Sequence, residues 1–232
     1  METLDFGHLA QLATTWALPV LIAITLHEAS HAYVAWRLGD DTAYLQGRVT
    51  FNPLKHVDPF GTVILPALLL MTGSGFLFGY AKPVPVNFRR LKHFRRDSAL
   101  VAIAGPGSNM ILAVVSALLL HVAVLAPSWF AEWSVQTLIN SMRLNIMLAL
   151  FNMLPLLPLD GGRVLAGILP PSLARPFFRT ERYGMFVLLA LIFLLPLIGG
   201  QLGMNLNILG WILGPASDYL LHLVVTLTGL TG

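Results

Sequence analysis

The sequence predicts an all-helical protein that crosses a membrane about five or six times and carries one small β-hairpin or edge-strand element. Hydrophobic residues fill 56% of the 232 positions and charged residues only 11%, and the mean hydropathy is +0.74. A soluble domain carries charge on about a quarter of its residues. Stretches near or above the ~17–20 apolar residues that span a bilayer as a helix fall at 8–35, 60–78, 98–126, 132–157, 183–199 and 205–228.

The first apolar stretch, 8–35, carries the pentapeptide HEASH at 27–31 near its end. Helix positions i and i+4 share one face, so both imidazoles can reach one tetrahedral zinc ion while Glu28 stands beside it. This H-E-x-x-H pattern is typical of zinc hydrolases. The chain has no cysteine, so any metal must be held by His, Asp or Glu.

A short hairpin or edge strand is predicted at 42–51, after the first apolar stretch. From Tyr44 to Phe51 every second residue is polar or aromatic, and the residues between are apolar or small, a pattern that favours a strand. Extended peptides commonly bind by adding a strand to a sheet edge. We therefore expect Arg48 and Val49 to contact a substrate peptide.

The second apolar stretch, 60–78, is interrupted by Pro66, Gly73 and Gly75 and is flanked on both sides by basic sequence. A full crossing would place one basic flank outside the cell. A re-entrant segment avoids this conflict, and irregular backbone is tolerated at membrane depth where protein covers it. The alternative is an ordinary transmembrane helix that contains proline and glycine.

Basic residues gather in two segments, 82–97 and 161–182, whereas 127–134 has an acid and no cation. The positive-inside tendency places the basic segments in the cytoplasm and 127–134 outside. We expect a multi-pass protein of a prokaryotic cytoplasmic (inner) membrane, with its active site toward the cytoplasm. The net charge is only +3, and nucleic-acid binding is not suggested.

The third and fourth apolar stretches, 98–126 and 132–157, lead to the candidate third metal ligand, Asp160. This acid follows a proline-punctuated apolar run and precedes two glycines, and an ionisable group in such a place marks function by default. If 60–78 does not cross, Asp160 reaches the same cytoplasmic half as the histidines. The Gly-x-Gly pair at 105–107 is interpreted as permitting close helix approach.

The last two stretches, 183–199 and 205–228, read only as apolar helices. No separate soluble domain remains between the apolar stretches. We therefore predict one membrane-embedded domain over 1–232, with a catalytic core at about 8–163 and C-terminal helices at about 183–228.

Three motifs together resemble the site-2 protease family of intramembrane zinc metalloproteases. They are HEASH at 27–31, Gly-Pro-Gly-Ser-Asn at 105–109, and the run from Asn152 that ends in Leu-Asp-Gly at 159–161. The stretches GRVTFNPLKHVDPFGT and AKPVPVN also resemble the compact bacterial branch, so the similarity covers about 27–163. The sequence shows no PDZ-like or CBS-like insertion, so substrate selection of that kind is expected either to be absent or to come from a separate adaptor protein.

The resemblance implies that Glu28 is the general base and that one Zn²⁺ is bound per chain. It implies that Asn109 orients substrate or helps to stabilise an oxyanion, and that Asn152 either contacts substrate or caps backbone. The implied zinc ligands are His27, His31 and Asp160.

The predicted function is hydrolysis of peptide bonds in or near the transmembrane segments of single-pass proteins within the lipid bilayer. One alternative is a metal or ion transporter that uses the same His, Glu and Asp cluster as a transit site. A second is a prenyl-protein-type membrane zinc protease, which would take a glutamate from a later helix. A third is an inactive scaffold, which the presence of all four catalytic positions disfavours.

Overall fold

The computed structural model describes residues 6–64, 68 and 82–230, and within these ranges the regular elements are all helical. The prediction of an all-helical membrane protein is confirmed at this level. The helices are α1 (Phe6–Arg37), α2 (Thr42–Leu45), η1 (Pro53–Lys55), η2 (Pro59–Ile64), η3 (Phe88–Arg90), α4 (Phe94–Ala123), α5 (Ser128–Asn152), α6 (Asp160–Ile168), α7 (Pro171–Arg179), α8 (Glu181–Leu189), η4 (Ala190–Leu194), α9 (Leu195–Gln201) and α10 (Ile208–Leu227).

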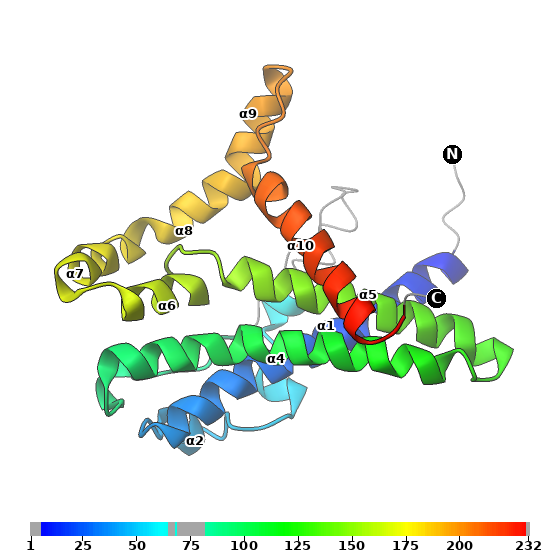
Figure 1. Cartoon of the computed structure of the whole chain (residues 1–232), viewed down its shortest axis with the longest axis horizontal. Coiled ribbons are helices and arrows are strands. Elements are labelled where there is room, and N and C mark those ends of the chain that lie inside the picture. The colour runs from blue at the N-terminus through cyan, green and yellow to red at the C-terminus, as the bar shows by residue number, and fades with distance from the viewer. Residues whose placement is uncertain (1–5, 65–67, 69–81, 231–232) are drawn as a thin grey trace.

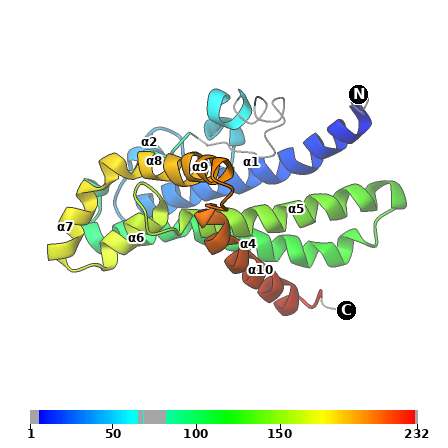
Figure 2. The same ribbon diagram turned by 90° about the horizontal axis from the view of Figure 1, so that it is seen from above.

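Three long helices, α1, α4 and α5, lie side by side and form the centre of the molecule (Figures 1 and 2). The chain runs along α1, returns along α4 and reverses again along α5, so the end of α1 and the end of α5 lie at the same end of the bundle. Small residues, Ala113 and Ala117 of α4, pack against Met142 and Ile146 of α5. Small side chains let helix backbones approach closely where the surrounding solvent is lipid.

Four helical stretches in the described part of the chain are long and apolar enough to cross a membrane: 13–37, 94–123, 181–201 and 208–227. They overlap the predicted stretches 8–35, 98–126, 183–199 and 205–228. Helix α5 coincides with the predicted 132–157 stretch but carries more polar side chains, several of them buried inside the bundle. The predicted re-entrant segment 60–78 lies mostly outside the described residues, so the number of spans stays a prediction.

The strand predicted at 42–51 is wrong, because this segment, all of which is described, forms the one-turn helix α2 followed by a turn and bends. Asp40 explains the difference. Its buried carboxylate accepts hydrogen bonds from the Thr42 backbone N–H (3.0 Å) and the Thr42 hydroxyl (2.5 Å), which start a turn. Tyr44 then stacks on Trp36 of α1, with ring centroids 5.0 Å apart. Alternation alone could not reveal these contacts.

The C-terminal third is arranged differently from the bundle. After α6 and α7, a continuous helical stretch of α8, η4 and α9 leans away from the three long helices, and α10 returns across α5 (Figure 1). One tight contact ties α8 to the rest of the molecule. A Cβ added at Gly184 would collide with the carbonyl group of Leu157, in the loop that leads into α6.

Candidate metal centre

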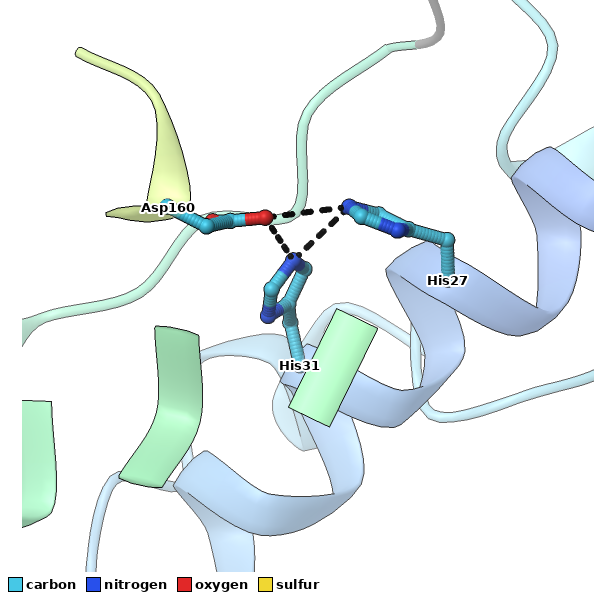
Figure 3. A group of neighbouring side chains, drawn as sticks. All are labelled: His27, His31 and Asp160. Carbon is cyan, nitrogen blue, oxygen red and sulfur yellow. Dashed lines mark hydrogen bonds and ion pairs between the residues drawn. The ribbon is translucent and has the colours of Figure 1, made fainter. Parts of the chain in front are cut away.

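The histidines of the HEASH motif and the predicted third ligand meet where α1 passes the start of α6 (Figure 3). His27 and His31 lie on one face of α1, and Asp160 is the first residue of α6. A tight loop brings Asp160 to this position. A Cβ at Gly161 would collide with the carbonyl of Met153, and one at Gly162 would lie 2.5 Å from the backbone nitrogen of Leu157. The glycines therefore allow the chain to fold back beside the acid.

Three potential ligand atoms converge on one point. The Nε2 atoms of His27 and His31 are 3.0 Å apart, and each lies 3.3 Å from Oδ2 of Asp160. Both histidines are buried, with 8% of their surface exposed. Within the described ranges, no other group of three or more His, Cys, Asp or Glu side chains has this arrangement.

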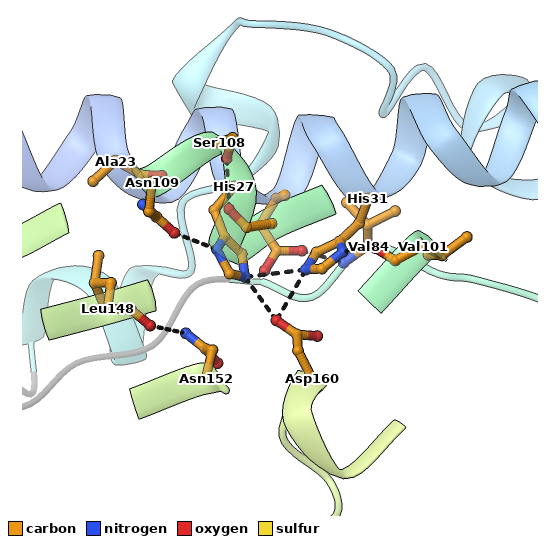
Figure 4. Close-up of polar contacts among 12 residues, drawn as sticks. Ala23, His27, His31, Val84, Val101, Ser108, Asn109, Leu148, Asn152 and Asp160 are labelled. Atoms are coloured by element: carbon orange, nitrogen blue, oxygen red, sulfur yellow. Dashed lines mark hydrogen bonds and ion pairs between the residues drawn. The ribbon is translucent and has the colours of Figure 1, made fainter. Parts of the chain in front are cut away.

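Hydrogen bonds on the far side of each imidazole fix which nitrogen is free to bind a metal. Nδ1 of His31 lies 2.7 Å from the carbonyl oxygen of Val101, and Nδ1 of His27 lies 2.6 Å from Oδ1 of Asn109 (Figure 4). Both partners are oxygens that can only accept, so each Nδ1 must carry the proton. In the neutral form of each imidazole, Nε2 then presents a lone pair, the state that metal ligation requires.

The converging atoms fit a zinc ion. Burial raises the pKa of Asp160, and protonated imidazoles beside it lower that pKa to about 2, so the group is a carboxylate when a cation, imidazolium or metal, lies beside it. Its Oδ2 is buried and has no hydrogen-bond partner among the described residues. Two lone pairs and a carboxylate oxygen repel one another unless a cation lies between them. Tetrahedral zinc with ligand distances of about 2.0–2.1 Å separates its ligand atoms by roughly 3.3 Å, which matches the observed triangle.

Helix α4 closes the metal centre through Gly105. A Cβ added there would collide with Nε2 of His31 and lie 2.6 Å from Cε1 of His27. Gly107 has no atom within 4 Å of such a Cβ. The predicted close helix approach is therefore present at Gly105 and absent at Gly107.

Glu28 lies beside the ligands and contacts a different part of the chain. Its Oε2 accepts a hydrogen bond from the backbone N–H of Val84, at 2.7 Å. Val84 belongs to the segment 82–87, which is tied at both ends. The buried guanidinium of Arg48 donates to the carbonyl of Lys82 at 2.7 Å, and Oδ2 of Asp40 accepts from the N–H of Asn87 at 2.6 Å.

The structure gives the two predicted substrate-strand residues other surroundings. Arg48 is 6% exposed and holds the 82–87 segment, whereas Val49 is half-buried in a bend after α2. Without a strand at 42–51, the physical basis for a substrate contact by these two residues is gone.

The two predicted asparagines lie at different depths. Asn109 is fully buried, and its amide contacts His27 on one side and Asn145 on the other. A direct contact between Asn109 and substrate stays a prediction, because the described contacts of its side chain are all within the protein. Asn152 ends α5 on the Asp160 side of the ligands, and its amide nitrogen donates to the carbonyl of Leu148 at 3.0 Å (Figure 4).

Sequence reasoning missed three groups around the ligands. The Val101 carbonyl and the Val84 N–H belong to the backbone, so a pattern of side chains in the sequence cannot predict their contacts. Asn145 did leave a signal, because it is an amide within an apolar stretch, where polar residues commonly knit helices together.

Comparison with known proteins shows clear relatives. The chain is 44% identical over 190 residues to YwhC of Bacillus subtilis, a predicted zinc metalloprotease, covering 77% of this chain and 79% of YwhC. It is 30% identical over 172 residues to Rip2 of Mycolicibacterium smegmatis and 32% identical over 181 residues to Rip2 of Mycobacterium tuberculosis, which have the same description. These matches cover 74% and 78% of this chain, and 64% and 66% of the mycobacterial proteins. No solved structure matches.

The buried His, His and Asp triangle among membrane-type helices defines a membrane-embedded zinc metalloprotease. The model of peptidase family M50 matches residues 120–195, which include Asp160. The chain belongs to this family, the site-2 proteases. Neither the fold nor the comparisons favour the transporter alternative.

Proposed function

We propose that this protease cuts single-pass membrane proteins in or near their transmembrane segments, at the cytoplasmic side of a prokaryotic inner membrane. His27, His31 and Asp160 hold the zinc ion, and Glu28 is the general base. The observation that carries this proposal is the triangle of ligand atoms at 3.0–3.3 Å, together with the two Nδ1–H tautomers that aim both Nε2 lone pairs into it.

Each residue has a definite task in hydrolysis. Zinc, when bound, makes water acidic enough to ionise near neutral pH and polarises the substrate carbonyl. The Glu28 carboxylate takes the proton from the attacking water, and the oxygen of that water forms the new bond to the carbonyl carbon. Glu28 then returns the proton to the amine nitrogen as the C–N bond breaks. Asn152, at the end of α5, is our candidate for contacting the substrate backbone.

Substrate access, in this proposal, involves the 82–87 segment rather than a strand at 42–51. This segment lies against Glu28 through the Val84 N–H, so a substrate that reaches Glu28 must share or displace it. A helical substrate must also unwind locally, because its carbonyls are engaged in i to i−4 hydrogen bonds. A separate adaptor protein would select substrates.

The orientation in the lipid bilayer rests on charge. The basic segment before α4 and the basic α6–α7 region lie at the end of the bundle where α1 ends (Figure 1), and positive loops favour the cytoplasm. Because the chain lacks cysteine, the single substitutions Arg89→Cys and Trp129→Cys each give one thiol that can be labelled from either side. We expect the thiol at position 89 to react from the cytoplasm and the thiol at position 129 to react from outside; the reverse pattern would overturn this orientation.

The decisive experiment compares variants of the full chain in lipid vesicles with a panel of model single-pass substrates. Glu28→Gln should keep one zinc per chain and lose cleavage by at least about 10²–10³-fold, because no general base remains. Asp160→Asn should lose zinc. Glu132→Gln, an acid-to-amide change at an exposed site in α5, is the matched control and should cleave like the wild type. Undiminished cleavage by Glu28→Gln, or full zinc content in Asp160→Asn, would overturn these assignments.

A further inference from the structure

A chain of hydrogen-bonded side chains leads away from the metal centre into the interior of the bundle. Nδ2 of Asn109 donates to Oδ1 of Asn145 at 2.7 Å. Nδ2 of Asn145 in turn donates to the backbone carbonyl of Ser141 at 2.8 Å, and the Ser141 hydroxyl lies 2.8 Å from that of Ser116. Asn109 and Asn145 are both fully buried.

The Ser141 carbonyl, at the end of this chain of hydrogen bonds, determines which group donates and which accepts in each amide contact up to His27. The Ser141 carbonyl can only accept, so the NH₂ group of Asn145 must face it. The oxygen of Asn145 then faces α4, and it can receive only the NH₂ group of Asn109. The oxygen of Asn109 is thereby turned toward His27, whose Nδ1 must carry the proton.

We propose that Asn145 is a positioning residue for the metal centre, which fixes the orientation of the Asn109 amide and through it the tautomer of His27. This inference rests on the proposed role of His27 as a zinc ligand. A flipped Asn109 would present its NH₂ group to Nδ1 of His27. That arrangement favours the tautomer with the proton on Nε2, which cannot bind zinc.

Asn145 is the main restraint on this amide. The other acceptor for Nδ2 of Asn109 is the carbonyl of Ala23, at 3.5 Å, a distance at which a hydrogen bond is weak. Apolar packing in the bundle cannot tell the two ends of an amide apart, since oxygen and NH₂ have nearly the same size. Only a hydrogen-bonding partner of fixed polarity can do so, and Asn145 is such a partner.

Asn140 provides a matched control. It lies on the same helix, is 3% exposed, and is bonded to Gln136 at 2.9 Å and to the carbonyl of Thr15 at 3.4 Å. These hydrogen bonds lead away from His27, Asn109 and Asn145. Replacing either asparagine with alanine removes a buried amide from the same bundle, so a difference in zinc binding between the two variants isolates the link to His27.

The experiment measures zinc transfer from the zinc-loaded full chain, in detergent micelles, to a chromogenic chelator. Removing a group that is hydrogen-bonded to a metal ligand weakens metal affinity by about 10–100-fold. Asn145 is one hydrogen bond further from the ligand His27, because it contacts Asn109 and not His27 itself. We therefore expect Asn145→Ala to weaken zinc binding about tenfold and Asn140→Ala to stay within about twofold of the wild type. If Asn145→Ala does not fold, Asn145→Leu replaces it, because leucine fills the volume but offers no acceptor.

A second background tests the route of the effect. In Asn109→Asp, the carboxylate offers an oxygen to His27 whichever way it turns, so Asn145 is no longer needed to orient it. Adding Asn145→Ala to Asn109→Asp should then cause no further loss of zinc affinity. A loss that persists in this background, or equal losses in Asn145→Ala and Asn140→Ala, would overturn the inference and leave the proposed function intact. A wild-type chain that binds no zinc would overturn both.

Discussion

The helices that form the metal centre and the C-terminal helices differ in what surrounds them. In the apolar part of α4, 39% of the residues are buried, against 17% in the 181–201 stretch and 11% in α10. In the first region, His27 of α1, Asn109 of α4 and Asn145 of α5 form one hydrogen-bonded chain. The C-terminal helices expose large apolar side chains, such as Phe186 and Leu227, at 72% and 74%.

This contrast shows which part of the fold must hold its side chains in fixed positions for catalysis. The 181–201 stretch and most of α10 expose apolar side chains that suit a lipid environment and make few protein contacts, apart from Val224 of α10, which packs into the core formed by α4 and α5. A metal centre needs ligand atoms held to within about half an ångström, which requires packing and hydrogen bonds behind each ligand. Substitutions that disturb chemistry should therefore fall in the first region, and equivalent substitutions in the second should have small effects.

The largest effect is expected for Gly105→Ala. The added methyl group would occupy the space of the His27 and His31 rings, and a displacement of about 1 Å at a catalytic group can cost 10²-fold in rate. We expect a loss of cleavage of at least about 10²-fold, with zinc content well below one per chain, measured on purified protein.

Gly107→Ala is the control for Gly105→Ala, because it lies on the same helix and its Cβ would meet open space. It should retain zinc and cleavage close to wild type. A Gly105→Ala protein with normal zinc content and activity would show that α4 does not pack on the ligands as described.

Removing zinc should loosen one region and leave the other unchanged. A ligand present at 100 times its Kd stabilises the folded state by about 2.7 kcal/mol. His27, His31 and Asp160 join α1 to α6, and α4 packs on the two histidines. In hydrogen exchange with and without chelator, we expect protection to fall in α1, α4 and α6 and to stay constant in α10. An equal loss of protection in α10 would show that the molecule responds as one unit.

Much of the candidate site could be predicted from the sequence, because its elements carry local signals. The i, i+4 spacing of His27 and His31 needs only a helix, and Asp160 stands out as an acid after an apolar run. The strand predicted at 42–51 is wrong because Asp40 accepts a local hydrogen bond from Thr42 and a non-local one from Asn87, and the second could not be predicted from the sequence. The role of Arg48 is non-local in the same way, since it depends on the carbonyl of Lys82, 34 residues away.

A smaller effect is expected for Gly184→Ala, which tests the close contact between α8 and the loop before α6. Its methyl group would collide with the carbonyl of Leu157, three residues before Asp160. We expect cleavage to fall about tenfold because α8 must shift or push the loop that carries the ligand. Gly200→Ala, whose Cβ would meet open space in α9, should cleave normally. Wild-type activity in Gly184→Ala would show that the loop position does not depend on α8.

The smallest effect is expected for Glu181→Gln, in an ion pair that joins α8 to α6. The Glu181 carboxylate lies 2.8 Å from the guanidinium of Arg163, but the two side chains are 40% and 24% exposed. Ion pairs of this kind contribute about 0–1 kcal/mol, and Arg163 also packs over the ring of Phe88 at 4.5 Å. We expect cleavage within about twofold of wild type. A tenfold loss would mean that this pair transmits the position of α8 to Asp160, three residues before Arg163 on α6, and the division into two regions would fail.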